Sequence, residues 1–191
     1  MRPSIRFGAA AAILAGLAPL PAFAQEGDLT DSDSANFQVI GTVPALCSIG
    51  LPDNTGGVFD IGVLVDTTTG LLRSDLAAPG KVLAGAFCAS RSTIAISATP
   101  MLAQNFSGTA PAGFSSSVNY VASASGWTET PARFDTGSSG NAAATQGRDS
   151  AFTGDITVGV SAFSTAGGAQ LRPVADDAYQ GQITVTLTAA E

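Results

Sequence analysis

The two cysteines are the residues whose type and spacing point most directly to covalent chemistry. Cys47 and Cys88 are the only cysteines of the chain, and they stand 41 positions apart. In an exported protein, two cysteines favour one disulfide over two free thiols, because oxidising compartments form and retain such bonds. We therefore expect a Cys47–Cys88 disulfide and no free thiolate that could act as a nucleophile.

Other catalytic chemistry has few candidate residues. The chain contains no histidine, which excludes Ser-His-Asp and Cys-His catalysis and removes the commonest metal ligand. Asp176 and Asp177 could form an acid–base pair or a cation site, but neighbouring strand residues point to opposite faces. A turn before the last strand is the favoured interpretation. We expect no enzymatic activity, no catalytic residue, no cofactor and no metal ion.

The single tryptophan, Trp127, has two interpretations. It could be an exposed platform on which a sugar stacks. A lone tryptophan in a β-domain more often packs in the core or at its rim, because burial of so large a ring is favourable. We favour the packing role and keep a glycan platform as the alternative.

The N-terminus has the pattern of a secretory signal peptide. Arg2 and Arg6 precede an apolar stretch over residues 7–20, and Ala22-Phe23-Ala24 forms a small-x-small cleavage site. The apolar stretch is too short to span a membrane. We expect residues 1–24 to be removed and the mature protein to be exported as a soluble product, without membrane insertion.

The charge of the chain disfavours nucleic acid as a partner. Loss of Arg2 and Arg6 would leave six basic residues against 15 acidic ones, a net charge of −9. Such a surface repels phosphate backbones and anionic lipids. Four of the acidic residues fall within residues 25–35, which predicts a disordered acidic tail.

Alternation of apolar and polar residues predicts that the rest, residues 36–191, is one all-β domain. Residues 37–49 alternate, and Pro44 places that strand at a sheet edge or breaks it. Further strands are expected over residues 58–65, 81–88, 92–98, 118–123, 155–163 and 179–188. Residues 131–150 predict a long mobile connection. With no helical stripe, about seven strands indicate a β-sandwich.

In the last strand, four apolar residues share one face. They are Tyr179, Ile183, Val185 and Leu187. The threonines between them favour a strand by their β-branching and keep the opposite face wet.

Several segments, in chain order, carry a resemblance to a known family. They are Phe37-x-Val39-x-Gly41-x-Val43-x-Ala45-x-Cys47-Ser48-Ile49, Phe59-Asp60-Ile61-Gly62, Cys88, Val118-Asn119-Tyr120 with Trp127, and Ala178-Tyr179-x-Gly181-x-Ile183-Thr184-Val185-Thr186-Leu187. Together they resemble spore coat protein U domains, the pilin-like secreted subunits of archaic chaperone–usher pili.

The resemblance implies an immunoglobulin-like sandwich that lacks its final strand and is completed by a neighbouring subunit. It implies a donor strand over residues 36–43, with Phe37, Val39 and Val43 inserted and Gly41 allowing close approach. The implied partners are identical or related subunits, a periplasmic chaperone and an outer-membrane usher. The C-terminal strand would pair with the chaperone, and the assembled fibre would serve adhesion or biofilm formation. The implied location is the cell surface, in a fimbrium, or the medium, reached through the periplasm.

A second hypothesis stays open beside the fibre subunit. The chain could be a self-complete secreted sandwich that binds a glycan or a surface protein. That hypothesis predicts a stable monomer, whereas a strand-exchanging subunit predicts polymers.

Overall fold

The computed structural model describes residues 34–53 and 56–190, and the chain divides into two units, residues 1–40 and 41–191. The expected signal peptide and most of the acidic tail lie outside the described residues. In the described part of the second unit, strands dominate and the one helical turn is the 3-10 helix η1 (Ala142–Ala144). None of the described residues form a helix long and apolar enough to cross a membrane.

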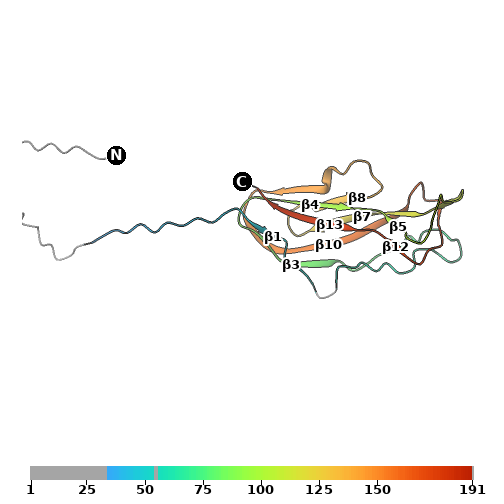
Figure 1. The fold of residues 1–191 in the computed structure, drawn as a ribbon, viewed down its shortest axis with the longest axis horizontal. Helices are drawn as coiled ribbons and strands as arrows, with labels where there is room; N and C mark the ends of the chain where they lie inside the picture. Colours follow the sequence, from blue (N-terminus) through green and yellow to red (C-terminus); the bar gives the residue numbers. More distant parts are fainter. Residues whose placement is uncertain (1–33, 54–55, 191) are drawn as a thin grey trace, which may run out of the picture. The chain divides into compact units, whose positions relative to one another are not determined.

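The strands range in length from two to 14 residues (Figure 1). They are β1 (Cys47–Ser48), β2 (Leu51–Pro52), β3 (Lys81–Cys88), β4 (Ser92–Ala98), β5 (Met101–Ala103), β6 (Phe114–Ser115), β7 (Ser117–Ser125), β8 (Ala132–Asp135), β9 (Thr145–Arg148), β10 (Phe152–Thr165), β11 (Arg172–Pro173), β12 (Tyr179–Gln180) and β13 (Ile183–Ala189).

Two antiparallel sheets enclose the core. The larger has the order β1-β3-β10-β7-β5-β12, with β2 also on β3 and β8 also on β7, and the smaller has the order β13-β4-β9. Strands β6 and β11 form a small parallel pair. The core joins side chains of both sheets, among them Ile94 and Ile96 from β4 and Ala122 and Ile156 from β7 and β10. The expected all-β sandwich is confirmed.

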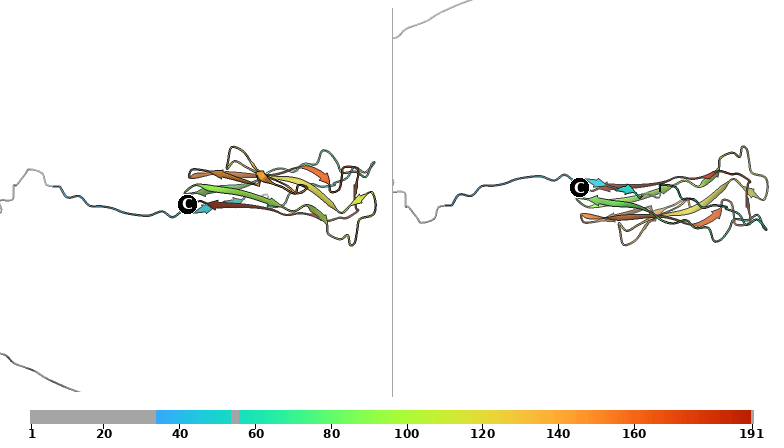
Figure 2. Two further views of the ribbon diagram at one scale, coloured as in Figure 1. Left: turned by 90° about the horizontal axis from the view of Figure 1, so that it is seen from above. Right: turned by 90° about the horizontal axis from the view of Figure 1, so that it is seen from below.

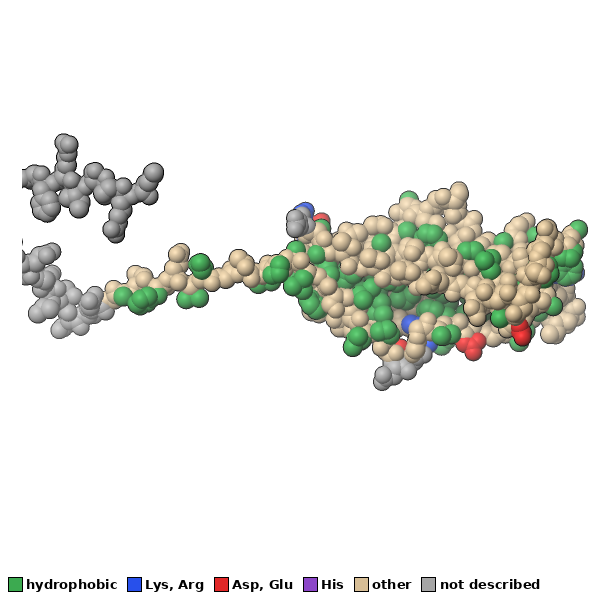
Figure 3. All heavy atoms as spheres, in the orientation of Figure 1, with side chains coloured by type: hydrophobic (Ala, Val, Ile, Leu, Met, Phe, Trp, Pro, Cys, Tyr) green, Lys and Arg blue, Asp and Glu red, His purple; other side chains and the backbone are tan. Residues whose placement is uncertain are grey.

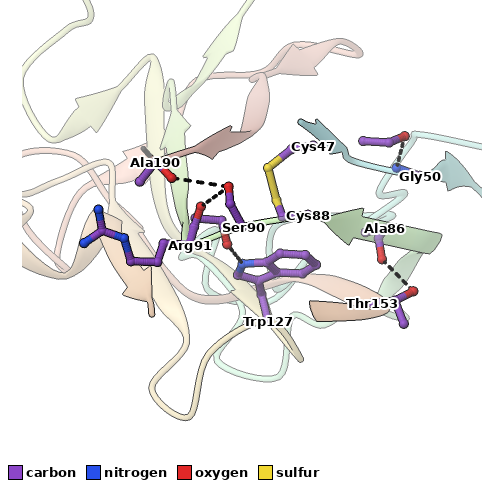
Figure 4. Close-up of a disulfide and its surroundings, with 11 residues drawn as sticks. Cys47, Gly50, Ala86, Cys88, Ser90, Arg91, Trp127, Thr153 and Ala190 are labelled. Carbon is purple, nitrogen blue, oxygen red and sulfur yellow. Dashed lines mark hydrogen bonds between the residues drawn. A yellow bond between two sulfur atoms is a disulfide. The ribbon is translucent and has the colours of Figure 1, made fainter. Parts of the chain in front are cut away.

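The disulfide expected from the sequence is present. It joins Cys47 of β1 to Cys88 of β3, whose Cα atoms pair in register. Figure 4 shows this bond beside the indole ring of Trp127, which is fully buried. The disulfide therefore ties the first strand of the domain to the larger sheet at the end where the chain also terminates.

Several expected strands match the structure closely. The bounds of β3 and β4 are those predicted, and β7 and β10 extend the predicted 118–123 and 155–163. The last strand is divided into β12, which pairs with β5 of the larger sheet, and β13, which pairs with β4 of the smaller sheet. Gly181 between them lies against the Thr99 backbone, where a Cβ would meet the carbonyl oxygen at 2.7 Å. A side chain at this position would push the two segments apart.

Three expectations about local structure are wrong. Of the strand predicted over residues 37–49, only β1 is paired. Residues 58–65 form no strand beyond an isolated bridge between Val65 and Leu72. The region expected to be a mobile connection, residues 131–150, contains β8, η1 and β9. In each case the deciding factor was the presence or absence of a neighbouring edge, which local alternation does not reveal.

Candidate binding groove

The last strand of the chain has a free edge. In the smaller sheet β13 pairs with β4 over its whole length, from Ile183 opposite Ala98 to Ala189 opposite Ser92. Within the described residues no strand pairs with the other edge of β13. Figure 2 shows β13 and β4 side by side in both views. An unpaired row of N–H and C=O groups is a template for one more strand.

A groove of about 720 Å³ lies beside this free edge. Tyr179, Ile183 and Val185 line it from the last two strands, and Val58, Phe59 and Ile61 line it from the segment that precedes β3. Figure 3 shows hydrophobic side chains gathered in the hollow on the face turned toward the reader. The groove is therefore apolar and open, and it is bounded on one side by backbone groups that have no partner strand.

The inner face of the larger sheet forms the floor of the groove. Val158, Val160 and Phe163 of β10 contribute to it, with Leu83 of β3. A β-bulge lies between Ser161 and Ser164, where Ala162 has a φ of 49°. The extra residue shifts the alternation by one position, so that Phe163, rather than Ala162, shares the inner face with Val160.

Phe163 also contacts the aromatic ring at the back of the groove. Its ring centroid lies 6.1 Å from that of Tyr120, whose hydroxyl donates to the Gln182 carbonyl oxygen at 3.3 Å. Burial raises the pKa of Tyr120. The tyrosine thus links the floor to the segment between β12 and β13, and its hydroxyl stays protonated as a donor.

A second hollow of about 800 Å³ continues the groove toward the loops. It shares Phe59, Ile61 and Tyr179 with the first and reaches Asp176 and Arg172. The two hollows therefore adjoin along these shared residues, and the second one reaches the loop that carries Asp176.

Asp176 organises the loop at that end. Its carboxylate accepts hydrogen bonds from the backbone N–H groups of Ala178, Asn105 and Phe106, at 2.8, 2.8 and 2.9 Å. These bonds, that from Ala178 foremost, hold the pKa of Asp176 below its usual range. Asp177 accepts from the Asn105 side-chain amide at 2.7 Å. The two acids hold the loop before β12, and the described residues contain no cluster of acidic, Cys or His side chains suited to a metal ion.

The predicted donor residues lie in an extended segment without paired strands. The exposed fractions of Phe37, Val39 and Val43 are 88%, 95% and 82%. Nothing lies within 4 Å of the Cβ position that a residue at Gly41 would have. Three large apolar side chains at alternate positions are thus left in water, which is costly unless another surface covers them.

Most of the predicted C-terminal residues do meet at one place. Tyr179, Ile183 and Val185 line the groove, and Leu187 packs against the core. Phe163, Met101 and Leu83 also line the groove, and the sequence pattern did not predict this role for them. Phe163 could not be predicted because the β-bulge shifts the alternation within β10. Met101 and Leu83 belong to strands whose inner face is set by the neighbouring strands.

Trp127 is not a platform for a sugar. The residue is fully buried, and its indole N–H donates to Ser92 Oγ at 3.1 Å. The packing interpretation is confirmed, and the glycan hypothesis loses the residue on which it rested. No protein-family model, curated protein or solved structure matches this chain.

Proposed function

We propose that this protein is an exported structural subunit that assembles into a surface fibre by β-strand complementation. Residues 37–43 of one copy would enter the groove of another and pair with the free edge of β13. The observation that carries the proposal is the coexistence of two unsatisfied features: an apolar groove along an unpaired strand, and an exposed segment with apolar residues at alternate positions.

The energetics support such an exchange. Burial of Phe37, Val39 and Val43 would contribute roughly 1.5–3 kcal/mol for each side chain. Main-chain hydrogen bonds along β13 would add directionality, as in other cases of β-augmentation. A fibre built in this way has a donor and an acceptor in every copy, so the contact is head-to-tail and does not close.

The unpaired edge of β13 and the apolar groove also support the need for a chaperone. An exposed edge beside an apolar groove promotes aggregation until it is covered. A periplasmic chaperone that pairs with β13 would cover it, and an outer-membrane usher would follow. Adhesion or biofilm formation is the role that we propose for the fibre.

A pair of single substitutions in the donor segment tests this function. The mature protein from the cell surface is run on an SDS gel without boiling, since strand-exchanged copies dissociate slowly. We expect a ladder that collapses to one band on boiling, and we expect Val39→Asp to abolish it because a charge cannot enter an apolar groove.

Gln38→Asp is the matched control. It introduces the same charge one position away, on the opposite face of the donor segment, and should leave the ladder intact. A single band in the unboiled wild-type lane, or equal ladders for the two variants, would contradict the proposed function.

A further inference from the structure

Residues 57–62 line the groove and are held to the domain in an unusual way. We call this segment the strap. The side chains of Phe59 and Ile61 are half-buried, and Phe59 packs against the core, whereas Val58 is 74% exposed. The strap therefore alternates in burial like a strand: Phe59 and Ile61 turn inward, and Val58, which also lines the groove, is exposed to solvent.

The backbone of the strap has no strand partner. Among the described residues, the N–H and C=O groups of 57–61 make no hydrogen bond to another segment, and Gly62 N–H is bonded only to Asp60 Oδ1, at 2.9 Å. Two apolar side chains thus account for most of its attachment. A segment with few buried contacts and an exposed backbone opens more easily than a paired strand.

The ends of the strap are marked by glycines in the left-handed region. Gly56, just before it, has a φ of 70°, and Gly62 has a φ of 69°. Such backbone is accessible to glycine at little cost and costs other residues energy. Both positions can change conformation without a side chain that resists, which suits them to be hinges.

The strap carries the same pattern as the donor segment. Phe59-Asp60-Ile61 and Phe37-Gln38-Val39 both read phenylalanine, polar residue, β-branched residue. The first triplet lines the groove of its own domain with Phe59 and Ile61, and the second triplet is exposed. The groove is therefore already lined by a side-chain set of the kind that the donor segment carries.

We infer that the strap is an intrachain placeholder: Phe59 and Ile61 fill part of the groove until the donor segment of a second copy displaces them. This inference rests on the proposed function, because it concerns the same groove. Only the fraction of molecules with the strap released would be competent to bind, which weakens the apparent affinity of the donor by that fraction. The strap would thereby slow premature polymerisation and cover the groove before assembly.

Two glycine substitutions test the inference without touching a groove side chain. The full chain carries Phe37→Asp and Val39→Asp, so that its own donor segment does not compete with the added peptide for the groove. A fluorescent peptide with the sequence of residues 36–43 is titrated in, and its dissociation constant is measured by anisotropy. Gly62→Ala strains the seated strap, so we expect the peptide to bind roughly 5- to 30-fold more tightly.

Gly140→Ala is the matched control, because Gly140 lies outside the strap and is not among the residues that line the groove. Both Gly62 and Gly140 have open space around the added methyl group, but Gly140 lies outside the left-handed region. We expect its dissociation constant to stay within about twofold of the parent. Phe59→Ala should also tighten binding of the peptide, since it removes a large side chain from the groove. If Phe59→Ala does not fold, Gly62→Ala still tests the inference.

The outcomes separate the inference from the proposed function. Peptide binding that is equal in the parent and Gly62→Ala, or weaker in Gly62→Ala, would overturn the placeholder and leave strand complementation standing, with the strap as a fixed wall. A peptide that binds none of these proteins would contradict the proposed function and the placeholder with it.

Discussion

Single buried residues hold the disulfide end of the sandwich together. Trp127 donates its indole N–H to Ser92 Oγ, and its carbonyl oxygen accepts a hydrogen bond from Arg148 at 2.7 Å. The Arg148 guanidinium carbon lies 3.6 Å from the centroid of the Phe152 ring, which packs edge-on against the indole. One aromatic pair and one cation–π contact thus fix the packing of the turn after β7.

Removal of the Ser92 hydroxyl tests how much its hydrogen bond with the Trp127 indole contributes to stability. Ser92→Ala should lower the free energy of unfolding by about 1–3 kcal/mol, because it leaves the buried indole N–H without an acceptor. Urea denaturation measures the change. Ser97→Ala, on the exposed side of the same strand, should stay within about 0.5 kcal/mol of the wild type. Equal losses in the two variants would show that the indole bond contributes nothing.

Residue types foretold some of these roles and not others. The disulfide followed from the count of cysteines, and the burial of Trp127 from the size of its ring. The place of Phe163 in the groove did not follow, because strict alternation would put Ala162 on the inner face with Val160. A bulge changes the face of every later residue in a strand, and nothing in the local sequence marks this one clearly.

At the scale of elements, the loop that leads into β12 depends on an ionised carboxylate. Asp176 binds backbone N–H groups from two segments, so its folded-state pKa lies below the ordinary aspartate value of about 3.9. A depressed folded pKa means that this stabilisation is fully present above about pH 3.9 and is lost as the pH falls through the lowered value.

We therefore expect acid to affect the wild type more than a variant without this charge. The melting temperature should fall further between pH 5 and pH 2.5 in the wild type than in Asp176→Asn, as measured by circular dichroism. Asp149→Asn, an exposed position after β9, should behave like the wild type. Parallel pH profiles for wild type and Asp176→Asn would mean that the loop does not depend on the carboxylate.

The predicted elements show how far alternation can be trusted. It identified β3, β4, β7 and β10, whose apolar faces are buried against the opposite sheet. It predicted equally good strands at residues 37–49 and 58–65, and neither is paired over most of its length. Alternation reports that a segment suits a half-buried strand, while pairing also requires a free edge nearby. The two failures are the two segments that the proposed function uses.

At the scale of the whole molecule, the smaller sheet offers two edges to a guest strand. β13 lies at one edge, beside the apolar groove, and β9 lies at the other, with exposed Thr145 and Gly147. Backbone groups are available at both edges, and the apolar groove lies beside β13. Side chains at alternate positions need apolar pockets, so the groove selects the edge.

Amide hydrogen exchange upon addition of the donor peptide tests the central claim most directly. The full chain with Phe37→Asp and Val39→Asp is mixed with the peptide of residues 36–43, and exchange is followed by mass spectrometry. The account predicts slower exchange across residues 183–187 of β13 and no change across residues 145–148 of β9. Unchanged exchange along β13, or equal protection of both edges, would contradict strand complementation in the groove.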